Sequence, residues 1–422
     1  MTSSGDILSL AIDKPAAGGR MIGRADRLVV LVSGAIPGER VRAVVERMGK
    51  GVAYATTLDV EEASSDRRTL ASDPLCGGCL YAHIAYPRQL DLKSLVIADA
   101  FARIGHMTLP SAISVTPSPE QGYRMRARLH VRDRLVGFYR EGTHEVCEAR
   151  QTGQLLTGTV DALERLLGEM AAFGIEGVRE LEVAENVDVS ARAVALASRA
   201  AIGAPVLARL ADASGVTGLS TPYGEVGDAW VTDHLAIGAH PPVSLRRHVL
   251  AFFQGNRFLL DALVGYVMEQ VPDGGEVLDL YAGVGLFSLT AAALRGASVT
   301  AIEGDRIAAA DLAVNARASE GRVVAVHQAV ETAVGAAGRR RLAVGRGATV
   351  IVDPPRTGMS REALDGVIAL NAPRIVYVSC DVATLARDAR RLVDSGYTLT
   401  TGRAFDLFPN TPHVETVMVF RK

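Results

Sequence analysis

The sequence predicts a multidomain α/β protein: an OB-like β-barrel, then a central α+β domain, then a C-terminal doubly wound, Rossmann-like domain. Three observations support this prediction. Residues 1–68 hold short β-like runs between glycine turns, residues 69–240 mix helical and strand-like patterns, and residues 241–422 alternate strand and helix as parallel sheets with crossover helices do. The chain has 422 residues, 48% of them hydrophobic, which is enough to bury more than one core.

The N-terminal segment, residues 1–68, carries a turn signal about every ten residues. Glycine pairs at 18–19 and in GKG at 49–51, and the stretch AIPGE at 35–39, place glycine and proline where a chain reverses. Short strands at this spacing predict a small all-β barrel.

The central segment, residues 69–240, opens with CGGC at 76–79, and the amphipathic stretch YPRQLDLKSLVIADAFARIG that follows predicts a helix. Strand-like runs come next. In one of them, five arginines recur at even spacing and would line one face of a strand: Arg124, Arg126, Arg128, Arg132 and Arg134. Such a face is either a surface for phosphate groups or an ordinary solvated sheet face, and the sequence favours neither.

Composition narrows the class of protein further. The formal net charge is −2, and the N-terminus lacks a basic region followed by an apolar run, so we expect no signal peptide. No uncharged apolar stretch reaches ~18 residues, so we expect no membrane span. Four cysteines in so long a chain fit a reducing compartment, where CxxC is a metal or redox pair more often than a disulfide. We therefore expect a cytoplasmic protein.

In the C-terminal segment, DLYAGVG at 279–285 ends the first predicted strand and opens a helix. Glycines there let a ligand approach the backbone closely, and the helix N-terminus adds a favourable dipole. Glu303 ends the second strand, where a carboxylate can accept hydrogen bonds from ribose hydroxyls. The same pattern suits nicotinamide dinucleotides, and Glu303 alone could be a surface acid.

Two further strands end in residues that carry chemistry. DPPRTG at 353–358 follows the apolar run TVIV, and its prolines predict a rigid loop at the edge where open α/β sheets bind ligands. Cys380 ends the next strand, and the helix after it could lower the thiol pKa below the free value of ~8.5 and make Cys380 a nucleophile. The alternative is a buried cysteine that acts as a small hydrophobe.

Near the C-terminus, His413 and Glu415 have period-two spacing and would face the same way on a strand. Glu415 is an acid inside an otherwise apolar run, where its pKa would rise, as suits a proton acceptor. The stretch HVETVMVFRK predicts a final strand at the edge of the sheet, so a solvated strand face is the alternative role for Glu415.

Six motifs stand in the order in which the RNA uracil-5-methyltransferases carry them: FFQGN at 252–256, DLYAGVG, IEGD, VDPPRTG, YVSCD and HVETV. The chain resembles that family over essentially its whole length, and SGAIPGERV at 33–41 is similar to the TRAM domain, an RNA-binding β-barrel. The ordered set is far more specific than any one of its members.

The resemblance implies methylation of carbon 5 of a uridine in RNA, most consistent with 23S ribosomal RNA, with S-adenosylmethionine as methyl donor. Cys380 would add to carbon 6 of the uracil and form a covalent adduct, and Glu415 would then remove the proton from carbon 5. The positions that match the family's methyl-donor site are Gln254, Tyr281, Glu303 and Asp353. The target must be unpaired or flipped out. RNA is the expected partner, with no membrane and no obligate protein partner.

The ribosomal-RNA branch of the family also carries a 4Fe–4S cluster on four cysteines. Cys76, Cys79 and Cys147 match the last three of these, but Leu70 stands at the position of the first, and Asp73 is the nearest oxygen ligand. The resemblance therefore implies a cluster on three thiolates with a carboxylate or an open iron, since clusters tolerate replacement of a ligand. Zinc or an empty site are the alternatives.

Two other hypotheses compete with the ribosomal one. The first is a transfer-RNA uridine-5-methyltransferase, against which the TRAM-like segment and CGGC argue. The second is a non-catalytic TRAM-type RNA-binding iron–sulfur protein whose methyltransferase domain has decayed. The DLYAGVG, DPPR and SCD motifs are intact, which argues against decay, because a domain without catalytic function would be free to accumulate substitutions in each of them.

Overall fold

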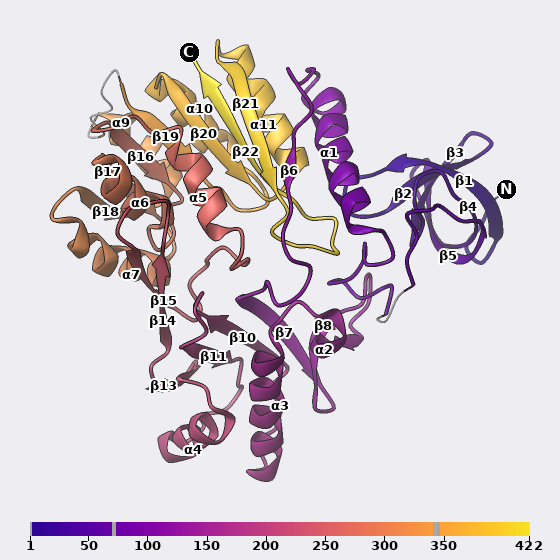
Figure 1. Cartoon of the computed structure of the whole chain (residues 1–422), viewed down its shortest axis with the longest axis horizontal. Helices are drawn as coiled ribbons and strands as arrows, with labels where there is room; N and C mark the ends of the chain where they lie inside the picture. The colour runs from indigo at the N-terminus through magenta and orange to yellow at the C-terminus, as the bar shows by residue number, and fades with distance from the viewer. Residues whose placement is uncertain (1, 70–72, 341, 343–346) are drawn as a thin grey trace.

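The computed structural model describes residues 2–69, 73–340, 342 and 347–422. Figure 1 shows an N-terminal barrel, a central part with its own sheet and helices, and a C-terminal sheet flanked by helices. This confirms the predicted multidomain α/β class and the N-terminal barrel. Within the described residues, no helix has both the length and the apolar character that a membrane crossing requires.

The N-terminal strands close into a barrel in the order β1-β2-β3-β5-β4. They are β1 (Ile7–Pro15), β2 (Met21–Ala25), β3 (Leu28–Ser33), β4 (Arg40–Gly49) and β5 (Val52–Glu62). In β4, alternate residues point inward: Val41, Ala43 and Val45 are buried, whereas Arg40 and Arg42 are exposed. The alternation gives the barrel a core of its own.

The central part contains a seven-stranded sheet in the order β13-β12-β11-β10-β7-β8-β9. Its strands are β7 (Arg126–Arg132), β8 (Leu135–Tyr139), β9 (Val146–Glu148), β10 (Glu180–Glu185), β11 (Arg192–Leu196), β12 (Gly218–Thr221) and β13 (Gly224–Gly227), and its helices are α2 (Ala149–Thr152), α3 (Thr157–Ala172) and α4 (Ala204–Ser214). Leucines of α3 and α4, such as Leu163 and Leu210, pack on this sheet in one buried cluster. The ribbon β14 (Trp230–Leu235) and β15 (Val243–His248) then leads to the C-terminal part.

The arginine row is largely occupied by partners within the protein. Arg126 and Arg128 both pair with Glu182 of the neighbouring strand, at 2.6 and 2.8 Å. Arg124 precedes the strand and donates to Gln154 Oε1 at 2.7 Å. Arg134 lies in the turn after β7, with φ 70°. The centre of the row is therefore paired with Glu182, and a role of these arginines in binding phosphate groups stays a prediction.

The C-terminal part is an eight-stranded sheet in the order β18-β17-β16-β19-β20-β22-β21-β6. Its strands are β6 (Val115–Thr116), β16 (Glu276–Leu280), β17 (Ser298–Glu303), β18 (Val323–His327), β19 (Thr349–Val352), β20 (Arg374–Ser379), β21 (Thr398–Phe405) and β22 (Glu415–Arg421). Its helices are α5 (Leu260–Met268), α6 (Leu286–Arg295), α7 (Arg306–Ala316), the short η1 (Arg317–Ser319), α8 (Val330–Val334), α9 (Ala336–Arg339), α10 (Arg361–Leu370) and α11 (Val382–Asp394). The doubly wound sheet is as expected from the alternating pattern.

Helix α1 (Tyr86–Arg103) and β6 precede the central sheet in the sequence but pack on the C-terminal sheet. Val96, Ile97 and Phe101 of α1 lie in the same buried cluster as Leu385 and Leu392 of α11. The boundaries at residues 69 and 241 remain predictions. In Figure 1, α1 stands between the barrel and the sheet, beside the loop that joins β21 to β22.

The prediction that the last strand is an edge strand is wrong. β22 lies inside the sheet and pairs antiparallel with both β20 and β21. Six of its seven residues, from Glu415 to Phe420, are buried. A strand that is buried on both faces carries consecutive apolar residues, and TVMVF fits that pattern better than an edge.

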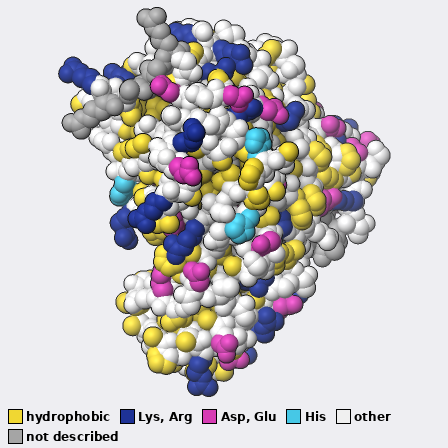
Figure 2. Space-filling view, turned by 60° about the vertical axis from the view of Figure 1, so that its left-hand side comes forward, with side chains coloured by type: hydrophobic (Ala, Val, Ile, Leu, Met, Phe, Trp, Pro, Cys, Tyr) yellow, Lys and Arg dark blue, Asp and Glu magenta, His cyan; other side chains and the backbone are white. Residues whose placement is uncertain are grey.

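Charge is mixed over the surface. On the face shown in Figure 2, basic side chains are interspersed with acidic ones. This agrees with the formal net charge of −2.

Candidate active site

Three loops leave the C-terminal sheet at one edge. β16, β19 and β20 are parallel neighbours, so the segments after them, 281–285, 353–358 and 380–381, emerge side by side. The strand order reverses between β16 and β19, and this switch point is where open α/β sheets bind ligands. The structure thus brings Tyr281, Asp353 and Cys380 together at this edge of the sheet.

Glu415 reaches the same edge from an antiparallel strand. Ser379 of β20 faces Thr416 of β22, so the register places Cys380 opposite Glu415 where the two strands end. Glu415 is 2% exposed, whereas Cys380 is partly open to solvent. A thiol and a carboxyl from distant segments therefore lie beside one another.

The FFQGN segment, residues 252–256, forms hydrogen bonds to two of the loops at this edge. Gln254 Nε2 donates to Asp353 Oδ2 at 3.2 Å. Asn256 Nδ2 donates to the carbonyl oxygen of Leu407 at 3.1 Å, in the loop before β22. One short segment thus contacts both the loop after β19 and the loop that leads to Glu415.

The glycine loop after β16 is held by Glu303. The Gly283 N–H donates to Glu303 Oε2 at 2.7 Å, and the Asp305 N–H donates to Oε1 at 2.6 Å. Gly285 has φ 100°, and a Cβ there would lie 2.5 Å from Leu289 Cδ2, so only glycine fits at the start of α6. Glu303 orders the loop with two of its lone pairs and keeps others for a ligand's hydroxyls.

The site is rich in carboxyl groups that lack cationic partners. Burial raises the pKa of Asp279 to about 7, and burial together with the charge of Asp279 raises that of Asp353 to about 7. Burial, then Asp353, raises the pKa of Glu415 well above its usual range. Among the described residues, Asp279 Oδ1 and Glu415 Oε1 accept no hydrogen bond. A buried cluster of this kind suits a positively charged ligand, whose charge would ionise the acids.

The expectation of a lowered pKa for Cys380 is wrong in the free protein. Burial raises the pKa of its thiol to about 12, and the charges of Glu415 and Asp353 act in the same direction. The dipole of α11 does not lower this pKa, because the Asp381 carboxylate occupies the helix N-terminus. It accepts hydrogen bonds from the amides of Ala383 and Thr384. The nearby guanidinium of Arg356 opposes these effects.

Arg356 lies at this edge and was not among the site residues predicted from the sequence. It is exposed, and its charge lowers the pKa of Cys380, Glu415 and His413. His413 precedes β22 in the loop, and burial lowers its pKa to about 4, so its ring is neutral near pH 7. The only sequence signal for Arg356 was its place directly after the two prolines.

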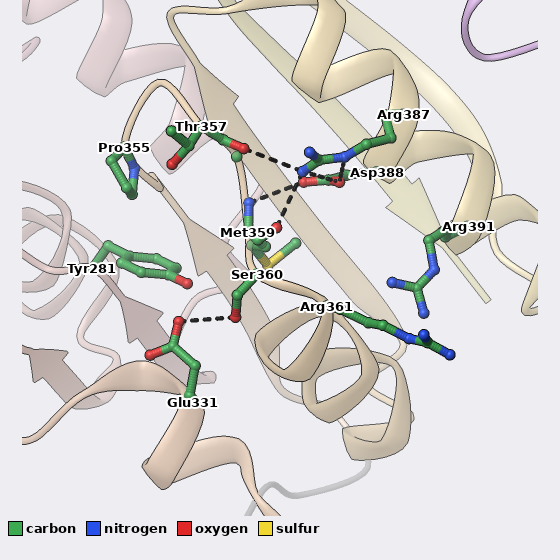
Figure 3. Close-up of a pocket in the computed structure, with 11 residues that line it drawn as sticks. Tyr281, Glu331, Pro355, Thr357, Met359, Ser360, Arg361, Arg387, Asp388 and Arg391 are labelled. Atoms are coloured by element: carbon green, nitrogen blue, oxygen red, sulfur yellow. Dashed lines mark hydrogen bonds and ion pairs between the residues drawn. The ribbon is translucent and has the colours of Figure 1, made fainter.

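The loop after β19 is braced by α11, as Figure 3 shows. The buried carboxylate of Asp388 accepts from the Met359 N–H at 3.0 Å and from the Tyr377 hydroxyl at 2.7 Å. Arg387 Nη2 donates to the carbonyl oxygens of Thr357 and Met359. These contacts fix the loop relative to the helix that starts just after Cys380.

Behind this loop lies a cavity of about 710 Å³. Of the predicted site residues, Tyr281 alone lines it, together with Glu331, Ser360 and the arginines of α10 and α11 (Figure 3). Cys380 and Glu415 are not part of its lining. The cavity therefore lies beside the edge that carries Cys380 and Glu415.

The three cysteines of the central segment also meet in space. Cys76, Cys79 and Cys147 are buried in one cluster, and Cys76 and Cys147 form a disulfide. Asp73 pairs with Arg140 at 2.6 Å, and Leu70 lies outside the described residues. The part of the chain that the structure describes holds no group of three or more His, Cys, Asp or Glu that could bind a metal. In this arrangement the residues do not fit a 4Fe–4S cluster, because its ligands are thiolates.

Comparison with known proteins points to one family. The family model described as tRNA (Uracil-5-)-methyltransferase matches residues 225–422. Two relatives described as 23S rRNA (uracil(1939)-C(5))-methyltransferase RlmD are each 33% identical to this chain. The one from Alkalilimnicola ehrlichii covers 96% of this chain and 94% of its own length, and the one from Halomonas elongata covers 97% and 88%.

A solved structure shares the whole fold. The Pyrococcus abyssi tRNA (uracil-54, C5)-methyltransferase, in complex with S-adenosyl-L-homocysteine, superposes with a TM-score of 0.75 over 97% of this chain and 99% of its own. Its sequence is 24% identical, so this likeness concerns the fold. The full-length identity to the two relatives settles the family. The chain belongs to the RNA uracil-5-methyltransferases.

Proposed function

We propose that this protein transfers a methyl group from S-adenosylmethionine to carbon 5 of a uridine in 23S ribosomal RNA. The observation that carries the proposal is the placement of the Cys380 thiol opposite the Glu415 carboxyl, beside the Asp353 loop, at the switch point of the sheet. The relatives that match over the whole chain are named for this reaction on 23S rRNA.

Each residue has a chemical task in this proposal. The Cys380 thiolate forms a bond to carbon 6 of the uracil, and the displaced electron pair makes carbon 5 an enolate carbon. That carbon would take the methyl group as the bond between the methyl group and the donor's sulfur breaks, which leaves the sulfur neutral. Glu415 then takes the proton from carbon 5, the double bond between carbons 5 and 6 reforms, and the thiolate leaves. The two groups act in sequence on adjacent ring carbons, which their adjacent strand ends allow.

The methyl donor would lie over the glycine loop. It supplies an electrophilic methyl group on a positively charged sulfur. Glu303 would bind its ribose, Tyr281 would border it, and Gln254 would hold Asp353 in place. The raised pKa values of the acids at this edge would fall when a cationic donor binds beside them, and the ionised carboxylates would then balance its charge.

The rest of the chain would hold RNA. We assign the barrel, residues 1–68, as a TRAM-type RNA-binding domain, residues 69–240 as the central domain and residues 241–422 as the methyltransferase domain. On the barrel, the Arg47 guanidinium lies 3.4 Å from the centre of the Tyr54 ring, a pairing that can stack on an unpaired base. Ribosomal RNA places the protein in the cytoplasm.

The test is methyl transfer to defined RNA. Unmodified transcripts of 23S rRNA fragments and of transfer RNAs are incubated with labelled S-adenosylmethionine, and 5-methyluridine is measured by nucleoside analysis. We expect label in one ribosomal fragment. Label in transfer RNA alone would support the transfer-RNA hypothesis instead. No label in any RNA, with tight RNA binding retained, would support the non-catalytic RNA-binding hypothesis.

The iron–sulfur cluster stays a prediction with a condition attached. It requires the Cys76–Cys147 disulfide to be reduced, so that all three sulfurs can act as thiolates, with a carboxylate or an open iron in place of the fourth thiolate. Iron and acid-labile sulfide are therefore measured after anaerobic purification under reducing conditions. Stoichiometric iron and sulfide would establish the cluster. A colourless, iron-free protein that still methylates RNA would remove it.

A further inference from the structure

A buried lysine on helix α1 holds the loop that leads to Glu415, residues 406–414. Lys93 is 1% exposed, and its Nζ donates to Asp406 Oδ1 at 2.5 Å and to the Phe408 carbonyl oxygen at 3.2 Å. Asp406 is fully buried. Removing two charges from water costs free energy that can offset their attraction, so a buried ion pair adds little to the stability of the fold. We therefore look for a role of this pair in positioning nearby residues.

A second contact from the same helix holds the middle of this loop. Gln89 and Asn410 exchange two hydrogen bonds: the side-chain Nε2 of Gln89 donates to Asn410 Oδ1, and the Asn410 N–H donates to Gln89 Oε1, both at 2.9 Å. Gln89 and Lys93 are four residues apart, so they lie on one face of α1. Asn410 has φ 63°, a conformation that needs such support.

The Glu415 side chain is only 2% exposed, so the strands packed around it enclose it. Its buried Oε1 accepts no hydrogen bond within the described part of the chain. Its place is therefore set by the backbone around it. Phe405, the last residue of β21, faces Glu415 in the sheet register, and Asp406 is the next residue. Lys93 thus binds Asp406, which is one residue beyond Phe405, the residue of β21 that pairs with Glu415.

We propose that Lys93 is a positioning residue for proton removal: its ion pair with Asp406 fixes the end of β21 and thereby the carboxyl of Glu415. The inference rests on the proposed function, because it takes Glu415 as the group that removes the carbon 5 proton. Cys380 follows a different strand, β20, whereas the Lys93 ammonium group donates to Asp406 and to the Phe408 carbonyl oxygen. Loss of the pair should therefore impair proton removal while leaving attack by Cys380 intact.

The test separates these two steps with two RNAs. RNA with 5-fluorouracil at the target forms an adduct but cannot lose a proton from carbon 5, so it reports attack and methyl transfer alone. Ordinary RNA reports complete turnover. Lys93→Met removes the charge and keeps the length of the side chain. Lys422→Met is the matched control, since Lys422 is exposed, donates from Nζ to Asn371 Oδ1 at 2.5 Å, and follows the end of β22 that is remote from Glu415.

For Lys93→Met we expect adduct formation with fluorouracil RNA at nearly the wild-type rate. We expect turnover of ordinary RNA to fall by about 10²-fold, the effect of a displacement near 1 Å at a reacting group. A denaturation-resistant adduct with ordinary RNA should accumulate in this variant, as in Glu415→Gln. Lys422→Met should match wild type in all three measurements.

Three results decide against the inference. If Lys93→Met loses adduct formation and turnover in parallel, the ion pair is only structural. If it turns over ordinary RNA like wild type, the pair does not position Glu415. If the variant fails to fold, Lys93→Met/Asp406→Leu removes both charges, and wild-type turnover in that variant would also overturn the proposal. A wild-type protein without any adduct on fluorouracil RNA would instead refute the proposed function itself.

Discussion

Replacing Cys380 with alanine should abolish methylation and the covalent adduct with 5-fluorouracil RNA. Without a nucleophile at carbon 6, carbon 5 of uracil gains no enolate character, and no other group at this edge can supply it. We expect the rate of methyl transfer to fall by at least about four orders of magnitude, as when other enzymes lose their nucleophile. Denaturing electrophoresis of labelled RNA with the wild-type and variant proteins measures the adduct directly.

The raised pKa of Cys380 adds a pH dependence to this expectation. With a thiol pKa of about 12 in the free protein, the thiolate fraction near neutral pH is only about 10⁻⁵ and grows tenfold with each pH unit. The second-order rate of adduct formation should therefore rise from about pH 6 to about 9 without a plateau at the ordinary thiol value. A plateau below that value would mean that the thiolate is already formed in the free protein.

Cys380→Ser is the control for this prediction. Serine keeps the branching and nearly the length of the side chain, but its hydroxyl is a far weaker acid than a thiol. The variant should therefore bind RNA and S-adenosylmethionine like wild type and form no adduct. Substantial methylation by either variant would mean that the reaction does not run through Cys380.

The fold and the edge of the site were accessible from sequence because they rest on local patterns. Buried parallel strands are short apolar runs, and each of three such runs ends in residues with chemical function, at 279–285, 353–358 and 380–381. Parallel strands of one sheet bring their carboxyl ends to one edge, so these segments had to meet. The place of β22 inside the sheet was missed, although its unbroken apolar run is typical of an interior strand.

The electrostatics of the site and its supports could not be predicted in the same way. The pKa of Cys380 depends on charges brought together by folding, and Glu415 lies 35 positions further along the chain. Lys93 and Asp406 are 313 residues apart, and no local pattern links a helix near the cysteines to the last loop. One sequence signal for the raised pKa of Cys380 was available. Asp381 stands where a helix N-cap is expected, and its negative charge opposes the formation of a thiolate at Cys380.

Replacing Glu415 with glutamine should leave the first step intact and block the last. In the free protein, burial and the charge of Asp353 raise the pKa of Glu415, which favours the protonated carboxyl, and glutamine resembles that form in shape and charge. A cationic methyl donor bound beside Asp353 would lower the pKa of Glu415 and ionise its carboxyl. After methyl transfer the donor's positive charge is gone, and the pKa of Glu415 rises again. The carboxylate is then a stronger base at the moment when the carbon 5 proton must leave.

Glutamine cannot take that proton, so we expect a methylated protein–RNA adduct to accumulate with ordinary RNA. Its breakdown should slow by about 10²- to 10⁴-fold, the usual contribution of a positioned base. A single-turnover time course that follows label in the adduct and in free 5-methyluridine measures both steps. Because adduct formation needs Cys380 and not Glu415, the double variant Cys380→Ala/Glu415→Gln should show no adduct. If Glu415→Gln releases product at the wild-type rate, another group removes the proton, and neutral His413 in the same loop becomes the first candidate to test.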